Sequence, residues 1–281
     1  MIDAYRRFMN IEAPPAPQRP KGFFTDTSLC IGCKACEVAC KQWNQLPADG
    51  NELSGNSYDN TGALGATTWR HVQFVEQAKA NNSRVGQRWL MMSDVCKHCA
   101  NAACLEACPT GALVRTEFGS VYVQQDICNG CGYCVPACPF GVIDRAPKDG
   151  HFEAGRAHKC TLCYDRQKDG LEPACAKACP TDSIQFGDIE ELQAKARRRL
   201  ADLRARGETS ARLYGMPEST EAPEVGHLNA FFLLLDRPEV YNLPEVPRLP
   251  RKTMAQRYAI SAVVGLAFAA LSAVAFGRRS G

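Results

Sequence analysis

The arrangement of the cysteines constrains this chain more than any other feature of its sequence. There are sixteen of them among 281 residues, and the segment Cys128–Pro139 reads C-x2-C-x2-C-x3-C-P. In bacterial ferredoxins this spacing places three thiolates on one [4Fe–4S] cluster, while the fourth cysteine, the one before proline, binds a second cluster. One run of this kind therefore predicts another run elsewhere, with which it exchanges a cysteine.

Three further runs meet that expectation. The first, Cys30–Cys40, has the same spacing but carries Lys41 in place of the proline. The second, Cys96–Cys108, has four residues between its second and third cysteines. The last run is split into Cys160–Cys163 and Cys175–Cys179, separated by eleven residues. The sixteen cysteines thus form four runs of four with none left over.

Disulfides and zinc are the other common uses of many cysteines. Arg6 and Arg7 are not followed by an apolar segment, so the N-terminus does not resemble a secretion signal that would favour disulfides. Zinc sites use two C-x2-C pairs per metal, whereas three cysteines at two-residue intervals before Cys-Pro are typical of iron–sulfur clusters. A zinc-binding scaffold remains the alternative from another functional class.

Exchange of the fourth cysteine assigns the ligands. Only a predicted hairpin separates the second and third runs, so we expect them to form one two-cluster module, which leaves the first and last runs to pair. The predicted ligand sets, one per [4Fe–4S] cluster, are Cys30, Cys33, Cys36 and Cys179 (set 1, cluster 1); Cys160, Cys163, Cys175 and Cys40 (set 2, cluster 2); Cys96, Cys99, Cys104 and Cys138 (set 3, cluster 3); and Cys128, Cys131, Cys134 and Cys108 (set 4, cluster 4).

Some polar residues lie beside these ligands without being counted among them. His98 lies within the second run and is interpreted as a neighbour of the cluster, because four thiolates are already available. Positive charge next to a ligand is expected to favour the reduced, more anionic cluster and so raise its potential. The candidates for this effect are Lys34, Lys41, Lys97, Lys159 and Lys177.

The predicted fold belongs to the α+β class and contains two ferredoxin-like modules, one inserted in the other. We expect the outer module in 21–92 and 147–207, ending in a helix after Asp188, and the inserted module in 93–146. Short strands are expected at 22–26, 69–76, 89–92 and 230–235. The remaining predicted parts are an extended N-terminal arm (1–20), an extended partner-contacting segment (208–257) and a single transmembrane helix (258–276).

The C-terminal segment is apolar enough to predict a membrane anchor. Residues 258–276 form a nineteen-residue stretch without a charged side chain, and a bilayer core requires about 20 such residues. Arg257 precedes the stretch and Arg278 follows it, as is common at the ends of a membrane span. By the positive-inside rule, the excess of basic residues before the span favours a cytoplasmic body.

Bulk charge and the absence of other motifs narrow the function. A net charge of +3 gives no reason to expect a nucleic-acid partner. No Ser/His/Asp set, glycine-rich phosphate loop or paired acid and base is apparent in the sequence. The chain is therefore predicted to be a non-catalytic electron carrier rather than an enzyme in its own right.

With these motifs the chain resembles the iron–sulfur (β) subunit of membrane-bound respiratory formate dehydrogenases. That family belongs to the wider group of four-cluster electron-transfer subunits of molybdenum or tungsten bis-pterin oxidoreductases. The resemblance covers nearly the whole chain. Besides the four cysteine runs, it rests on Ser57–Asn60, Trp69, Cys160–Arg166, Glu172–Cys175 and Asp236–Tyr241.

The resemblance implies a specific role and specific partners. A molybdenum or tungsten bis-pterin subunit would oxidise formate, and this chain would pass the electrons through four [4Fe–4S] clusters to a cytochrome b subunit and on to quinone. It also implies a cell-membrane location in contact with lipid, with the soluble body on the outer face, opposite to the side favoured by the basic residues. Within the same architecture, the alternative is the equivalent subunit of an uptake hydrogenase or another molybdoenzyme.

Overall fold

The structure of the chain, a computed structural model, describes residues 19–48, 53, 55, 58–77, 88–147, 154–218 and 224–277. They belong to two compact units, Met1–Pro247 and Arg248–Gly281. All sixteen cysteines lie in the described part of the first unit, and all are free thiols. The predicted N-terminal arm lies outside the described residues except for its last two positions.

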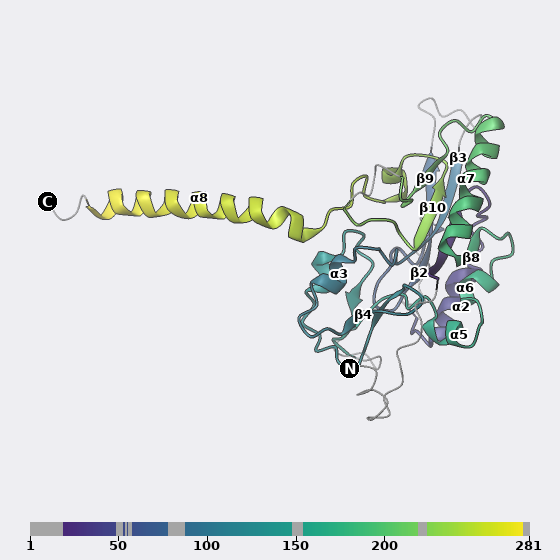
Figure 1. Cartoon of the computed structure of the whole chain (residues 1–281), viewed down its shortest axis with the longest axis horizontal. Coiled ribbons are helices and arrows are strands. Elements are labelled where there is room, and N and C mark those ends of the chain that lie inside the picture. The colour runs from purple at the N-terminus through teal and green to yellow at the C-terminus, as the bar shows by residue number, and fades with distance from the viewer. Residues whose placement is uncertain are drawn as a thin grey trace, which may run out of the picture. The chain divides into compact units, whose positions relative to one another are not determined.

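A four-stranded sheet is the largest element of the first unit (Figure 1), with strand order β8-β1-β10-β9. Strand β1 pairs antiparallel with β8 and parallel with β10, which in turn pairs antiparallel with β9. Strands β1 and β10 lie in the middle and are buried almost along their whole length, as expected for strands in the interior of a sheet. The strands are β1 (Lys21–Asp26), β8 (Ile184–Asp188), β9 (Arg212–Tyr214) and β10 (Ala230–Leu234).

The segment 208–257, interpreted from the sequence as an extended, partner-contacting stretch with a short strand at 230–235, belongs to the first unit over its described residues 208–218 and 224–247. It contributes β9, β10 and the 3-10 helix η1 (Pro238–Tyr241) to the folded body. The physical reason is the apolar run in β10, where Phe231 and Phe232 are fully buried. A strand that is apolar on both faces is stabilised in the interior of a sheet, and burial of each large apolar side chain contributes about 2 kcal/mol.

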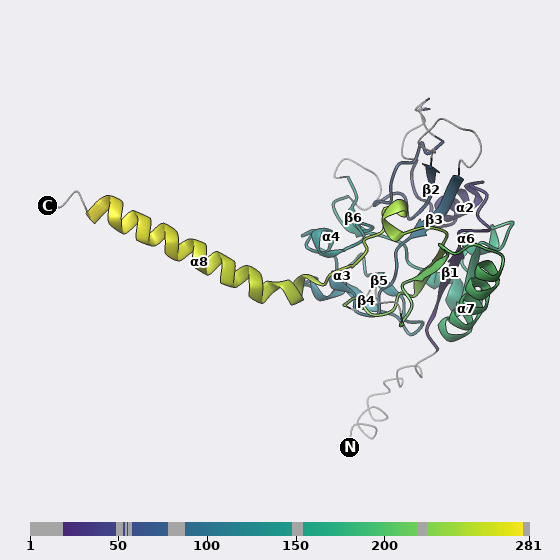
Figure 2. The ribbon, with the colours of Figure 1, turned by 90° about the horizontal axis from the view of Figure 1, so that it is seen from above.

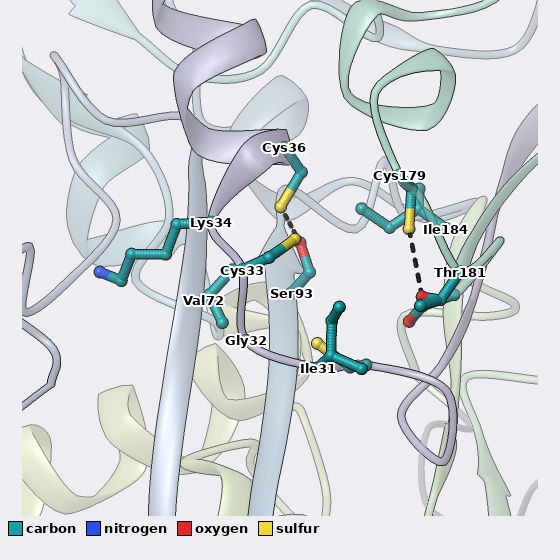
Figure 3. Close-up of a pocket in the computed structure, with 12 residues that line it drawn as sticks. Ile31, Gly32, Cys33, Lys34, Cys36, Val72, Ser93, Cys179, Thr181 and Ile184 are labelled. Carbon is teal, nitrogen blue, oxygen red and sulfur yellow. Dashed lines mark hydrogen bonds between the residues drawn. The ribbon is translucent and has the colours of Figure 1, made fainter.

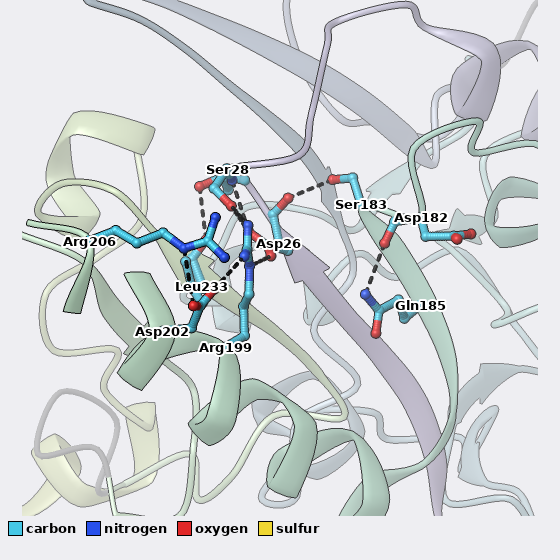
Figure 4. A network of polar contacts seen from close by, with 10 residues as sticks. Asp26, Ser28, Asp182, Ser183, Gln185, Arg199, Asp202, Arg206 and Leu233 are labelled. Carbon is cyan, nitrogen blue, oxygen red and sulfur yellow. Dashed lines mark hydrogen bonds and ion pairs between the residues drawn. The ribbon is translucent and has the colours of Figure 1, made fainter. Parts of the chain in front are cut away.

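Helix α7 (Ile189–Ala205) confirms the helix predicted after Asp188, and it packs along the sheet beside β1 and β8 (Figure 2). A polar network fixes its C-terminal half to the end of β1 (Figure 4). Arg199 Nε donates to Asp26 Oδ2 at 2.9 Å, and Arg199 Nη2 donates to Ser28 Oγ at 3.0 Å. Because Asp26 is almost fully buried, this ion pair also supplies the counter-charge that a buried carboxylate requires.

A long antiparallel hairpin and two short strand pairs complete the framework around the cysteines. The hairpin joins β2 and β3, and the two smaller antiparallel pairs join β4 with β5 and β6 with β7. The predicted strands at 69–76 and 89–92 and the hairpin between the second and third cysteine runs are confirmed. The bounds are β2 (Arg70–Gln77), β3 (Arg88–Val95), β4 (Leu113–Arg115), β5 (Val121–Val123), β6 (Asp144–Arg145) and β7 (Ala157–His158).

Short helices follow the cysteine loops. In each run the third cysteine is the first or second residue of a helix. These helices are α2 (Ala35–Asn44), α3 (Ala103–Glu106), α4 (Cys134–Ala137) and α6 (Ala174–Lys177). A further helix, α5 (Tyr164–Lys168), lies between the two halves of the last run. Where Cys-Pro closes the run the helix stops before it, because the residue before proline is disfavoured in helical conformation. Lys41 replaces that proline in the first run, so α2 continues past Cys40.

Two hydrophobic cores lie within the first unit. One contains Phe23, Trp69 and Val72 together with most cysteines of the first and last runs, and it also includes Cys96 of the second run. The other contains Leu113 and Val123 together with cysteines of the second and third runs. Cys138 packs against both cores, so the two cores adjoin at the cysteines of set 3.

The second unit consists of helix α8 (Pro250–Gly277). Its described apolar side chains are exposed, Leu266 by 72% and Phe268 by 66%. Within the part of the chain that the structure describes, no helix combines the length and the apolar character needed to cross a membrane. The predicted span over 258–276 therefore stays a prediction.

Candidate iron–sulfur centres

The cysteines of set 1 line one cavity beside α2 (Figure 3). Three come from the first run, and Cys179 reaches the same cavity from the end of the last run, just after α6. Two hydroxyl groups contact the sulfurs. Ser93 Oγ lies 3.2 Å from Cys36 Sγ, and Thr181 Oγ1 lies 3.8 Å from Cys179 Sγ. The fold thus brings the first and last runs together as the exchange of cysteines requires.

The cysteines of set 3 line a second cavity. Three belong to the second run, and Cys138 enters from the end of the third run, directly after α4. Lys97, His98 and Lys159 form polar parts of the cavity wall. In the described residues, no group of three His, Cys, Asp or Glu side chains is arranged to hold a single metal ion. In both cavities the cysteines instead surround a common space.

The cysteines of set 2 are also close neighbours, although they come from runs more than a hundred residues apart. Burial raises the pKa of the Cys40 thiol well above its ordinary value, and repulsion from three other cysteines raises it further. These three are Cys175, Cys160 and Cys163, the remaining members of set 2. Cys40 itself contributes through α2, which also carries Cys36 of set 1.

Set 4 is assembled in the same way from the third run and the end of the second. Burial raises the pKa of the Cys134 thiol to about 11, and repulsion from neighbouring cysteines adds to it. The neighbours are Cys128, Cys108 and Cys131, which complete set 4. The four cysteines of set 4 are therefore neighbours in the structure.

The thiols favour a bound cation or a proton over a bare negative charge. Burial is the main reason that the pKa values of Cys36, Cys104 and Cys163 are raised to about 12. Cysteine binds metals as the thiolate, so iron would displace these protons, and its positive charge would compensate for the poor solvation of four sulfurs. The donor set and its surroundings fit a cluster of iron and sulfide.

The loop between the first two cysteines has the same unusual backbone in all four runs. The residue before the second cysteine has a positive φ in each run, with values of 67°, 44°, 73° and 58° at Gly32, His98, Gly130 and Leu162. This left-handed conformation is costly for residues with a Cβ, and it persists where the surrounding structure requires it. The four loops are therefore repeats of one turn, including the two that lack glycine.

Backbone N–H groups point at the sulfurs, both from these turns and from neighbouring segments. Leu162 N donates to Cys160 Sγ at 3.3 Å, and Ala157 N donates to Cys128 Sγ at 3.5 Å. Burial raises the pKa of Cys30, and a hydrogen bond from the backbone N–H of Gly32 partly opposes that effect. Such N–H···S bonds stabilise negative charge on a cluster and so help to set its reduction potential.

Neighbouring sets adjoin one another in a fixed order. Cys36 of set 1 and Cys175 of set 2 are close enough for mutual repulsion to raise the pKa of Cys36. The same holds for Cys160 of set 2 with Cys96 of set 3, and for Cys104 of set 3 with Cys134 of set 4. At the two ends of this series, one cysteine of set 1 and one of set 4, Cys33 and Cys131, are exposed.

The lysines singled out in the sequence occupy very different environments. Lys97 and Lys159 are almost fully buried. Lys97 forms an ion pair with Asp94. Lys159 donates to the carbonyl oxygens of Val121 and Cys160. Lys34 lies 3.5 Å from carboxylate oxygens of Glu37 and Asp59, so its charge is neutralised locally. Lys41 binds carbonyl and hydroxyl oxygens, and Lys177 is exposed. Lys97 and Lys159 line the cavity of set 3, and Lys34 lines that of set 1.

His98 is a buried, neutral side chain in the wall of the set 3 cavity. Val121 N donates to its Nδ1 at 3.0 Å, so the neutral ring carries its proton on Nε2. Burial lowers the His98 pKa well below its ordinary value, and Lys159 and Arg115 add to the effect. Nε2 has no partner among the described residues. These contacts are consistent with the interpretation of His98 as a neighbour of the cluster.

Arg70 is the residue near the sites that the sequence interpretation did not include. It is 1% exposed, and its guanidinium lies 3.3 Å from Cys175 Sγ. In the sequence, Arg70 is a charged residue in a strand with alternating polar and apolar residues, and such a residue is easily interpreted as exposed to solvent. Its burial depends on contacts with β1 and α6, which are remote in sequence.

The comparisons with known proteins identify the family. The 4Fe-4S dicluster domain matches twice, over residues 87–189 and 29–112. The formate dehydrogenase iron-sulfur subunit of Haemophilus influenzae is 40% identical over 88% of this chain and 76% of its own length. The chain belongs to the family of formate dehydrogenase iron–sulfur subunits. The formate dehydrogenase-O iron-sulfur subunit of Escherichia coli is 38% identical over 88% of the chain and 80% of its own length.

A more distant relative is the B subunit of the anaerobic dimethyl sulfoxide reductase of Escherichia coli, 35% identical over 62% of this chain and 76% of its own length. The extensive matches to formate dehydrogenase subunits support the resemblance stated from the sequence. As a member of this family with two 4Fe-4S dicluster domains, the chain transfers electrons. It has the mixed α/β fold that these domains imply.

Proposed function

We propose that the chain carries electrons through four [4Fe–4S] clusters, from a formate-oxidising molybdenum or tungsten subunit to a cytochrome b in the membrane. The observation that supports this most directly is the grouping of sixteen cysteines into four crossed sets. Each set combines three cysteines of one run with the last cysteine of its partner run. A [4Fe–4S] cluster needs four thiolate ligands, and each set supplies that number.

The proposed ligands are those of sets 1 to 4, and the crossed pairing explains the domain organisation that we propose. The second and third runs would form an inserted two-cluster module, with the first and last runs forming the outer one. The second hydrophobic core supports this division, because all of its cysteines belong to the second and third runs, while the first core holds most cysteines of the first and last runs and meets the inserted module at Cys96 and Cys138. When bound, each cluster supplies one-electron redox chemistry. The protein holds the ligands, excludes water and directs N–H groups and cations at the sulfurs.

The order of the relay that we propose is 1-2-3-4. It rests on the close cysteine pairs that connect successive sets, from Cys36 and Cys175 through to Cys104 and Cys134. The terminal clusters would lie near the surface, beside the exposed cysteines Cys33 and Cys131. Exposed apolar side chains lie next to both, with Ile31 59% and Tyr133 63% exposed. These two surfaces suit contact with an electron donor and an acceptor.

The partners are proposed from the names of the relatives. Because the relatives are subunits of formate dehydrogenases, we propose a catalytic subunit with a metal bis-pterin site and a cytochrome b subunit. No observation favours an uptake hydrogenase or a zinc scaffold over this assignment.

Iron and sulfide analysis tests the cofactor proposal. Protein purified without oxygen should contain about 16 iron and about 16 acid-labile sulfide per chain, since four [4Fe–4S] clusters are expected. Reduction with dithionite should give electron paramagnetic resonance (EPR) signals from interacting clusters. About 8 iron per chain would contradict the proposal of four clusters. A colourless protein with zinc bound in a thiolate site would support the scaffold alternative.

We also propose that residues 258–276 anchor the chain in the cell membrane, with lipid around the helix and the body on the outer face. The uncharged nineteen-residue stretch and the exposed apolar side chains of α8 support this proposal. The side on which the body lies rests on the family resemblance alone.

Charged substitutions in α8 test the anchor. Val264→Arg with Leu271→Arg should release the complex from membranes washed with alkaline carbonate, because each arginine at the centre of a span costs about 3 kcal/mol. The control is Leu171→Arg, which places the same charge at an exposed apolar position of the body. Retention of the double variant, or loss of the unaltered chain under the same wash, would contradict a membrane span.

A further inference from the structure

Arg70 lies between two cysteine sets, contacting set 2 directly and set 1 through Ser93. Its Nη2 donates to Cys175 Sγ of set 2 at 3.3 Å. Its Nη1 lies 3.3 Å from the carbonyl oxygen of Ser93 and 3.4 Å from Ser93 Oγ. That hydroxyl is in turn 3.2 Å from Cys36 Sγ of set 1. A single guanidinium is therefore linked directly to one set and through one hydroxyl to the other.

The guanidinium is deeply buried and stays charged. Its carbon lies 4.6 Å from the centre of the Phe23 ring, and the side chain is 1% exposed. Burial alone would lower the pKa of Arg70, but the neighbouring Cys175, Cys36 and Cys160 raise it above its ordinary value. Arginine is protonated under all physiological conditions in any case. A full positive charge is thus held permanently in the protein interior.

No carboxylate forms an ion pair with Arg70 in the described part of the chain. A buried charge without a counter-charge is strongly destabilising, so this position requires anions nearby. The groups available are cysteines of sets 1 and 2. Four thiolates on a cluster give an anionic assembly, and two such assemblies flank this guanidinium.

The other buried cations differ in this respect. Lys97 has its own carboxylate partner in Asp94. Lys159 donates to two carbonyl oxygens and faces the cavity of set 3. Arg166 is also buried, and its Nε donates to the carbonyl oxygen of Glu172. Among the described residues, none of these three cations has a hydrogen bond to a cysteine sulfur, whereas Arg70 bonds to Cys175 of set 2 and reaches Cys36 of set 1 through Ser93.

We propose that Arg70 is a shared counter-cation of clusters 1 and 2 and raises the reduction potentials of both. The inference rests on the proposed four-cluster function. Reduction adds one electron to a cluster and breaks no bond, so the cluster becomes more anionic. A fixed cation nearby stabilises that product more than the oxidised form. Arg70 acts through the cluster potentials and is a positioning residue for electrons between the two sites.

The test is potentiometric titration of the complete complex, followed by EPR. Arg70→Gln removes the charge and keeps an amide donor. Two of the four cluster potentials should fall, each by at least a tenfold change in the reduction equilibrium, or about 59 mV for one electron. Arg70→Lys, which restores the charge, should recover most of the shift. The control is Lys177→Gln, an exposed cation two residues before Cys179, which should leave all four potentials unchanged.

A second variant tests the hydroxyl link from Arg70 to cluster 1 separately and keeps the buried charge of Arg70. Ser93→Ala removes the hydroxyl between Arg70 and Cys36, so one potential should fall, and it should be one of the two that respond to Arg70→Gln. This variant remains informative if Arg70→Gln does not assemble.

The outcomes distinguish this inference from the proposed function. Loss or absence of clusters in the unaltered chain would reject the function itself. Four intact clusters whose potentials do not change in Arg70→Gln, or all change equally, would overturn the role of Arg70. A Ser93→Ala variant that changes no potential would reject the bridge to cluster 1.

Discussion

Replacing Cys40 by serine should remove or alter the cluster that Cys160, Cys163 and Cys175 hold, and leave the cluster of the first run intact. Cys40 is four residues after Cys36 on the same helix, yet its neighbouring thiols are those of the last run. The iron content should fall from about 16 to about 12 per chain, or to about 15 if a three-iron cluster persists at the site.

Double substitutions show which cluster has been lost. Cys40→Ser combined with Cys160→Ser should cause no more loss of iron and EPR signal than Cys160→Ser alone, because both act on cluster 2. Combined with Cys30→Ser, it should cause the loss of two clusters. If Cys40→Ser added to the loss caused by Cys160→Ser but not to the loss caused by Cys30→Ser, the exchange of cysteines between runs would be rejected. Gln42→Ser provides the matched control, since Gln42 is an exposed residue of α2.

Gly22→Ala should unfold the outer part of the body at a much lower temperature. A Cβ at position 22 would lie 1.8 Å from the carbonyl oxygen of Asn229 and 2.4 Å from Ile189 Cδ1. The first of these atoms belongs to the backbone that leads into β10 and accepts the hydrogen bond from Phe23 N at 2.7 Å. Relief of the clash therefore requires β1 and β10 to separate, at a cost of about 3 kcal/mol or more.

Thermal loss of the cluster absorbance, recorded at one heating rate, measures this effect. A cost of that size corresponds to a decrease of roughly 10 °C in a domain of this length. Gly187→Ala is the matched control, because its Cβ would lie 3.9 Å from Leu192 in ordinary contact. Equal transition temperatures for the two variants would show that the approach of β1 to β10 is not tight in solution.

The four cysteine runs could be recognised in the sequence because the ligand spacing is fixed by the dimensions of a cluster. The spacing of cysteines within a run is a local pattern. The proposed exchange between runs follows because there are four runs of four cysteines, and each run gives its last cysteine to its partner run. The strands at 22–26 and 230–235 were also recognisable, since short apolar runs carry a strong local signal. Their pairing was not, because β1 and β10 are separated by about two hundred residues and no local pattern states which strands meet.

The electrostatic surroundings of the sites were the least predictable part. Lys97 and Lys34 both adjoin ligands in the sequence, but one is buried and the other is neutralised by Glu37 and Asp59. Arg70 is distant from every cysteine in the sequence and adjoins three in space. Burial and counter-charges depend on which remote segments pack together, and residue spacing carries no information about that.

The parallel pairing of β1 with β10 has a consequence for biosynthesis. At the usual speed of translation, Cys179 leaves the ribosome roughly ten seconds after Cys30, and β10 follows later still. Sets 3 and 4 are complete within a much shorter stretch of nascent chain. The ligands of clusters 3 and 4 are therefore all synthesised while the first run still lacks its last ligand, Cys179.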